Sequence, residues 1–163
     1  EDGVTALLVT HDQHEAFALC DEIGVMHNGQ LLQWDSAYSI YHEPVSQQVA
    51  DFVGEGRLLS GQVIDQRHVT CVLGRLCSST SLPQVNGSAV DVLFRPDDIV
   101  IDSASTQRAK VIERTFRGSH YMYTLQLQDQ QLLCLAPSHQ VHEAGELIGI
   151  RAVPEHVVTF PQR

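Results

Sequence analysis

Two histidines and two carboxylates stand close together near the beginning of the chain, within residues 9–17, VTHDQHEAF. His11 and His14 are three residues apart, with Asp12 and Glu15 beside them. Side chains of these types can ligate a metal, contact a phosphate or cap a helix. Zinc peptidases carry two histidines on one helix face with a glutamate between them, and the order here is different. The order argues against a metal site, whereas phosphate contact and helix capping remain open.

The segments around His11 determine what it can reach. Residues 4–10, VTALLVT, are apolar and rich in β-branched side chains, which predicts a strand buried on both faces of a parallel sheet. Asp12 and Glu15 have the spacing of a capping box and predict a helix that begins after Asp12. Ligands of open α/β sheets bind beyond the carboxyl ends of the strands. We therefore expect His11 to face a phosphate, because phosphoryl transfer depends on positioned hydrogen-bond donors.

Other groups of reactive side chains have structural explanations. Arg95 and Asp97, in the sequence RPDD, are candidate contacts for a regulatory ligand, although a proline-containing turn with a structural Arg–Asp pair is the favoured explanation. His139, His142 and Glu143 have metal-binding side chains, but no third cluster supports them, and we expect loop positions. The cysteines lack a CxxC pair, which predicts reduced thiols: Cys20, Cys71, Cys77 and Cys134.

Composition excludes several classes of function. The 163 residues carry a formal charge of −10 and include a single lysine, Lys110. Nucleic-acid binding needs clustered Lys and Arg, so no nucleic-acid partner is expected. The longest apolar runs are only a few residues, far below the roughly 20 that span a bilayer, and no signal peptide is visible. We therefore expect a soluble, cytosolic protein of one or two domains.

The chain changes character near Gly56. Before it, helices and strands are mixed. After the His11 helix, a hairpin around Asn28-Gly29 is predicted, with strands over residues 23–26 and 30–34. Two short helices are predicted next, over residues 36–41 and 46–53. Gly54-Glu55-Gly56 is typical of a hinge. After it, short strands of period two predict a small closed or nearly closed barrel: residues 58–64, 69–73, 90–94, 110–116, 121–127, 132–135, 147–152 and 157–160.

Residues 7–44 resemble a known family, in the sequence LLVTHDQHEAFALCDEIGVMHNGQLLQWDSAYSIYHEP. The ordered series Thr-His-Asp, Glu-Ala, a later Asp, Asn-Gly and Ile-Tyr-x-x-Pro resembles the switch loop and following segments of the ATP-binding subunits of ABC importers. The resemblance covers about the first 55 residues. It implies that His11 is the catalytic switch histidine, which reaches the γ-phosphate of ATP, and that Asp12 and Gln13 border the interface with a second ATP-binding subunit.

The second half resembles the regulatory domain of the same family. VDVLFRPDDIVI, residues 90–101, and GELIGIRAVPEHVVTFP, residues 145–161, are similar to the small TOBE domain, an OB-like barrel that follows the ATPase domain of many importers. The implied fold class is α+β. Residues 1–56 would be the C-terminal remnant of an α/β ATPase domain, and residues 57–163 an all-β OB-like (TOBE) barrel.

The motifs that complete an ATPase are missing from this sequence. It has no GxxxxGK[ST] loop, and the Walker B and signature motifs would precede residue 1. We expect the chain to be the C-terminal part of a longer subunit that uses ATP and Mg²⁺. Alone, it should bind no cofactor and hydrolyse no ATP.

The resemblance also implies partners and a location. The parent subunit would work with membrane-spanning permease subunits and a second copy of itself, and indirectly with a periplasmic solute-binding protein, on the cytoplasmic face of the inner membrane. The compact second half favours ferric iron as the solute, with polyamine, sulfate and thiamine importers as alternatives. A different class of function also stays open, a stand-alone module that senses an oxyanion or a metal.

Overall fold

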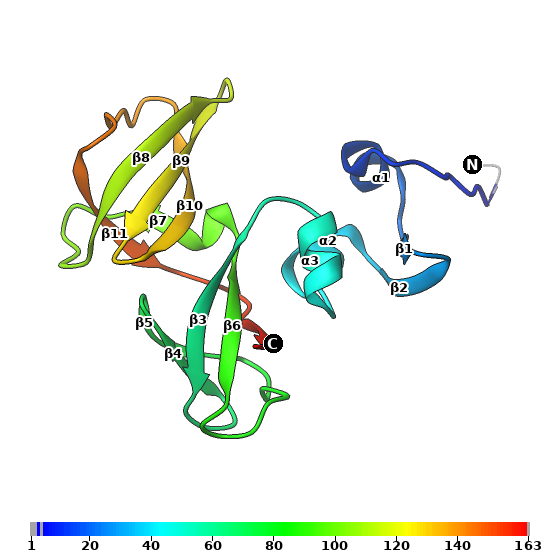
Figure 1. Ribbon diagram of the computed structural model, residues 1–163. Helices are drawn as coiled ribbons and strands as arrows, with labels where there is room; N and C mark the ends of the chain where they lie inside the picture. The colour runs from blue at the N-terminus through cyan, green and yellow to red at the C-terminus, as the bar shows by residue number, and fades with distance from the viewer. Residues whose placement is uncertain (1–2, 4, 163) are drawn as a thin grey trace. The chain divides into compact units, whose positions relative to one another are not determined.

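The computed structural model describes residues 3 and 5–162. The chain forms two compact units, Glu1–Gly54 and Glu55–Arg163, and each is described by itself. Helices and one hairpin build the first unit, and strands build nearly all of the second (Figure 1). Within the part of the chain that the structure describes, no helix is long and apolar enough to cross a membrane.

Helix α1, Gln13–Leu19, begins where the sequence predicts. The Asp12 side chain accepts hydrogen bonds from His14 N at 2.8 Å and from Glu15 N at 3.3 Å, as an N-cap should. The second half of the expected capping box is replaced, because the Glu15 carboxylate accepts a hydrogen bond from Thr10 Oγ1 instead. Thr10 Oγ1 in turn accepts from Asp12 N at 3.0 Å.

A hairpin and two short helices complete the first unit. Strands β1, Ile23–His27, and β2, Gln30–Asp35, pair antiparallel around Asn28 and Gly29, whose φ angles of 48° and 75° suit a tight hairpin turn. Helices α2, Ala37–His42, and α3, Gln47–Phe52, lie close to the ranges predicted for two short helices, and the side chains of Ser36 and Ser46 cap them. The small core of this unit comprises Val25, Ile40, Val49 and Val53.

The strand predicted over residues 4–10 is wrong for the residues that the structure describes. Residues 5–10 form no regular element, and Leu7 and Val9 expose 84% and 88% of their surface. Val4 lies outside the described residues. A buried strand of a parallel sheet needs a hydrogen-bonded neighbour on each side, and no described strand pairs with this segment. Apolar, β-branched composition is therefore insufficient to form a strand here.

The second unit contains two five-stranded antiparallel sheets. One has the order β12-β6-β3-β4-β5, from Val158–Pro161, Ala89–Phe94, Arg57–Val63, His68–Cys71 and Gly74–Cys77. The other has the order β10-β9-β8-β11-β7, from Gln130–Pro137, His120–Leu127, Arg108–Phe116, Leu147–Ala152 and Ile99–Ile101. A 3-10 turn, Pro96–Asp98, leads from β6 into β7.

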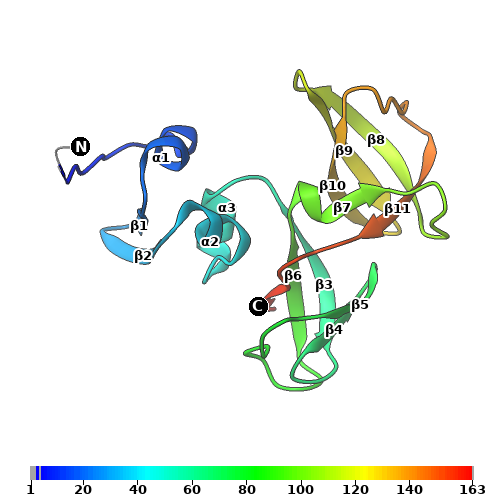
Figure 2. The same cartoon turned by 180° about the vertical axis from the view of Figure 1, so that it is seen from behind.

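The second sheet curls until its two ends meet. Strands β10 and β7 are the first and last in its order, yet they lie side by side in both views (Figures 1 and 2). The Cys134 thiol of β10 donates to the Ile99 carbonyl of β7 at 3.1 Å. The result is the predicted OB-like, nearly closed arrangement, accompanied by the other sheet. One core cluster spans both sheets, with Leu59, Val92, Tyr123, Leu125 and Ile150 almost fully buried.

Two glycines allow close backbone approaches in this unit. A Cβ at Gly149 in β11 would lie 2.1 Å from the Asp102 carbonyl oxygen, and one at Gly61 in β3 would lie 2.8 Å from the Thr70 carbonyl. Gly149 also accepts a backbone hydrogen bond from Asp102 N at 2.8 Å. Only a residue without Cβ permits these contacts. Gly149 therefore fixes where β11 passes from β8 to β7.

Candidate functional site

The His11 side chain is exposed in a loop that hydrogen bonds hold in shape. The loop ends at Asp12, the N-cap of α1, and Thr10 Oγ1 is bonded both to Asp12 N and to the Glu15 carboxylate. These contacts fix the backbone on both sides of His11. An exposed imidazole on such a loop can donate a hydrogen bond to an anionic ligand.

Gln13 and Asp12, predicted to border a subunit interface, have different surroundings. Asp12 is exposed and its carboxylate caps α1. The half-buried Gln13 points toward the end of α3, where its Nε2 donates to the Phe52 carbonyl and its Oε1 accepts from Gly54 N at 3.0 Å. The sequence gives no signal for this contact, because the partners are about forty residues apart. The interface role of both residues stays a prediction.

The remaining histidines of the sequence analysis do not gather. His14 and His139 are exposed, and the described residues contain no group of three or more side chains suited to a metal ion. His142 Nδ1 lies 2.8 Å from Glu146 Oε1, and its backbone N–H donates to the Tyr123 hydroxyl. Glu143 lies beside Arg114, at 3.0 Å from NH1. These contacts fasten the connection between β10 and β11 to strands β8 and β9.

Arg95 and Asp97 occupy different depths in the second unit. Arg95 is 2% exposed, and its NH1 donates to the Glu55 carbonyl at 3.3 Å, whereas Asp97 is exposed. Asp98, the last residue of the RPDD sequence, accepts from Arg95 N at 2.7 Å. Burial raises the pKa of Asp98 to about 6, against the lowering effect of that hydrogen bond.

Glu55 uses both of its carboxylate oxygens in an ion pair within the second unit. Its two carboxylate oxygens lie 2.7 and 2.8 Å from the NH1 and NH2 nitrogens of Arg117, in the turn between β8 and β9. Hydrogen bonding by Arg117 lowers the pKa of Glu55 below its ordinary value. The sequence analysis placed Glu55 in a hinge, but no local pattern links it to a residue as far along the chain as Arg117.

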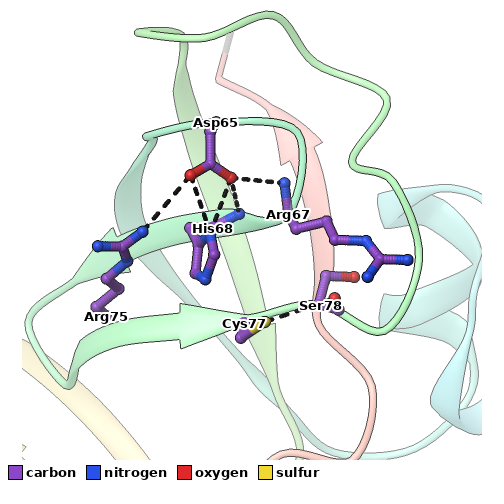
Figure 3. Close-up of polar contacts among 6 residues, drawn as sticks. All are labelled: Asp65, Arg67, His68, Arg75, Cys77 and Ser78. Atoms are coloured by element: carbon purple, nitrogen blue, oxygen red, sulfur yellow. Dashed lines mark hydrogen bonds and ion pairs between the residues drawn. The ribbon is translucent and has the colours of Figure 1, made fainter.

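A polar cluster lies at the turn between β3 and β4 (Figure 3). The Asp65 carboxylate accepts from the backbone of Arg67 and His68, both at 2.9 Å, and lies 2.8 Å from His68 Nδ1. Arg75 NH2 approaches it at 3.5 Å. The hydrogen bond from Arg67 N is the main cause of a lowered pKa for Asp65. Cys77 is the cross-strand neighbour of His68. The cluster orders the turn, and the sequence analysis missed it.

Comparison with known proteins identifies the second unit and relates the whole chain to importers. Residues 92–160 match the family model of the TOBE domain. Over 157 residues, 95% of the chain, it is 32% identical to the spermidine/putrescine import ATP-binding protein PotA of Desulfitobacterium hafniense, strain Y51, of which it covers 44%. It is 34% identical over 128 residues, 78% of the chain, to PotA of Mesomycoplasma hyopneumoniae, strain J, of which it covers 29%.

The chain therefore spans less than half the length of these relatives. The predicted resemblance to ATP-binding subunits of importers and to a TOBE domain is confirmed at that level. The finer assignment to the ferric-uptake branch is not supported, because these relatives are named for spermidine and putrescine.

A solved structure gives the fold independently. The cytoplasmic molybdate-binding protein ModG, with molybdate bound, superposes with a TM-score of 0.55, covering 65% of this chain and 96% of its own. At 12% identity, this similarity shows the fold alone, and it agrees with the predicted OB-like sheets.

Proposed function

We propose that the chain is the C-terminal part of the ATP-binding subunit of an ABC importer that takes up polyamines. Similarity to PotA along 95% of the chain carries the proposal, because it includes the His11 segment as well as the TOBE domain. The first unit would be the end of the nucleotide-binding domain, and the second a regulatory domain. Permease subunits and a second copy would complete the transporter on the cytoplasmic face of the membrane.

His11 is the catalytic residue of this proposal. Its imidazole is exposed on a loop held by Thr10, Asp12 and Glu15, and an exposed imidazole can donate a hydrogen bond to a terminal phosphate oxygen. ATP with Mg²⁺ would supply the phosphoryl group in the longer protein. The residues that cradle the other phosphates would come from outside these 163 residues, since the sequence has no GxxxxGK[ST] loop.

Replacement of His11 tests the catalytic role in the longer protein. His11→Ala should lower ATP turnover by about 10²–10³, the usual effect of losing one hydrogen-bond donor to the transition state, while ATP binding stays nearly intact. His14→Ala, three residues away and exposed, is the matched control and should retain normal turnover. Steady-state phosphate release and nucleotide titration measure the two quantities. Normal turnover in His11→Ala would reduce His11 to a residue of the loop.

The solute is proposed from the relatives, not from the geometry of this chain. Polyamines were an open alternative in the sequence analysis, and the named function of the two PotA proteins now favours them over ferric iron. Polyamines are organic cations and ferric iron is an inorganic one, so the two solutes are easily distinguished in an uptake assay.

A further inference from the structure

Gln13 connects the His11 loop with the end of the first unit. It lies two residues after His11, in the first turn of α1. Its side-chain amide donates to the Phe52 carbonyl and accepts from Gly54 N at 3.0 Å, and thereby pairs with the backbone as a neighbouring strand would. Phe52 ends α3, where carbonyl groups lack partners within the helix. The start of α1 is thus fastened to residues 52–54.

The next residue is anchored in the second unit. The Glu55 carboxylate forms the two-pronged ion pair with Arg117, at 2.7 and 2.8 Å, and Arg95 NH1 donates to the Glu55 carbonyl. Arg95 is 2% exposed, so this donor cannot move without repacking its surroundings. Paired hydrogen bonds between guanidinium and carboxylate also fix orientation.

Only the Gly54–Glu55 peptide bond separates the two anchors. Gly54 has φ of 83°, a left-handed conformation that glycine adopts without strain. The backbone torsions between the two anchored segments are therefore those of Gly54 and Glu55. Hinges of this kind use a few residues that absorb the change in backbone angles.

We infer that Gln13 is a positioning residue that couples the His11 loop to the joint between the two units. A displacement of the His11 loop moves the first turn of α1. The hydrogen bonds of the Gln13 amide then displace Phe52 and Gly54 as well. Thermodynamic linkage makes the effect reciprocal: a change in the conformation of Gly54 and Glu55 alters the free energy of nucleotide binding at the His11 loop by the same amount as nucleotide binding alters the free energy of that conformational change. The inference rests on the proposed function for its nucleotide, whereas the contact itself is a property of this chain.

The first test uses the present chain and needs no nucleotide. Gln13→Ala removes the acceptor for Gly54 N, and amide hydrogen exchange at Gly54 should become at least about ten-fold faster. Gln13→Glu retains an acceptor, and its exchange rate at Gly54 should lie between those of wild type and Gln13→Ala. Gln48→Ala, at an exposed glutamine of α3, is the matched control and should leave exchange at Gly54 unchanged. Equal exchange in wild type and Gln13→Ala would overturn the inference.

The second test uses the longer protein and a non-hydrolysable ATP analogue. Binding of the analogue should change hydrogen exchange at residues 52–55 in wild type and in Gln48→Ala. In Gln13→Ala this response should be lost, while affinity for the analogue changes less than about three-fold. An undiminished response in Gln13→Ala would overturn the coupling alone. Failure of the wild-type protein to bind the analogue would contradict the proposed function and, with it, the coupling.

Discussion

Individual residues of this chain owe their properties to contacts that differ even between like side chains. Asp98 and Glu55 are both carboxylates of the second unit, and their pKa values shift in opposite directions. Burial dominates at Asp98 and raises its pKa to about 6, whereas the hydrogen bond from Arg117 dominates at Glu55 and lowers it. Through Asp98, the stability of the second unit falls as the pH rises, and through Glu55 it falls as the pH is lowered.

Asp98→Asn should stabilise the second unit at neutral pH. The pKa of Asp98 is raised from 3.8 to about 6 on folding, so its contribution is fully present below 3.8 and is lost as pH rises through 6. The asparagine oxygen can still accept from Arg95 N. Urea unfolding at pH 5 and pH 7.5 should show a smaller fall in unfolding free energy for Asp98→Asn than for wild type. Asp129→Asn, at an exposed position of the second unit, is the control, and parallel pH profiles for wild type and Asp98→Asn would contradict the prediction.

The sequence predicts residue contacts only where they are local. Asp12 caps α1 as expected, because a cap involves backbone groups two or three residues away. The two short helices predicted over residues 36–41 and 46–53 also form, each capped by a serine. Gln13 binds backbone about forty residues away, and Glu55 pairs with Arg117 across the second unit. Neither contact leaves a pattern in the sequence, since both depend on the fold that brings the partners together.

Elements follow the sequence where their own pattern suffices. The hairpin of β1 and β2 forms around Asn28-Gly29, and the alternating residues of β9 form a strand as predicted. Strand β5, Gly74–Cys77, was missed because a glycine and an arginine dilute its signal. Residues 5–10 have a strong strand signal and form no strand. A strand needs partners, and local composition does not reveal whether they are present.

Gly149→Ala should destabilise the second unit by about 2 kcal/mol or more, a usual cost of overpacking. Its Cβ would lie 2.1 Å from the Asp102 carbonyl oxygen, so β11 would have to move away from the backbone of Asp102. That movement would disturb the pairing of β11 with β7 and β8. Chemical denaturation measures the loss, with Thr115→Ala, at an exposed position of β8, as the control. Unchanged stability of Gly149→Ala would mean that the backbone yields there at little cost.

At the scale of the whole molecule, each unit has its own core. The cluster of the second unit draws on both of its sheets. Among the described residues of the first unit, the buried members of the cluster are Val25, Ile40, Val49 and Val53. The sequence analysis expected the change near Gly56, from the shift in hydrophobic period. It did not foresee that Glu55 is held by Arg117 and Arg95.

Residues 55–163 should therefore fold without the first unit. Their core is internal, and a polypeptide that starts at Glu55 keeps the ion pair with Arg117. A single cooperative thermal transition, followed by circular dichroism, is the expected result. Omission of residues 55 and 56 should lower the transition temperature, mainly because the buried Arg95 loses the Glu55 carbonyl as an acceptor. The partly exposed ion pair with Arg117 contributes less. A broad, non-cooperative transition would show that the first unit completes the core.

Uptake of labelled solute tests the central proposal most directly. In cells that lack the complete gene, energy-dependent uptake of labelled spermidine should fall to background, and the wild-type gene should restore it. The His11→Ala gene should not restore it, whereas the His14→Ala gene should. Uptake of labelled ferric iron should be the same in all of these cells. Normal spermidine uptake without the gene, together with loss of ferric iron uptake, would contradict the account.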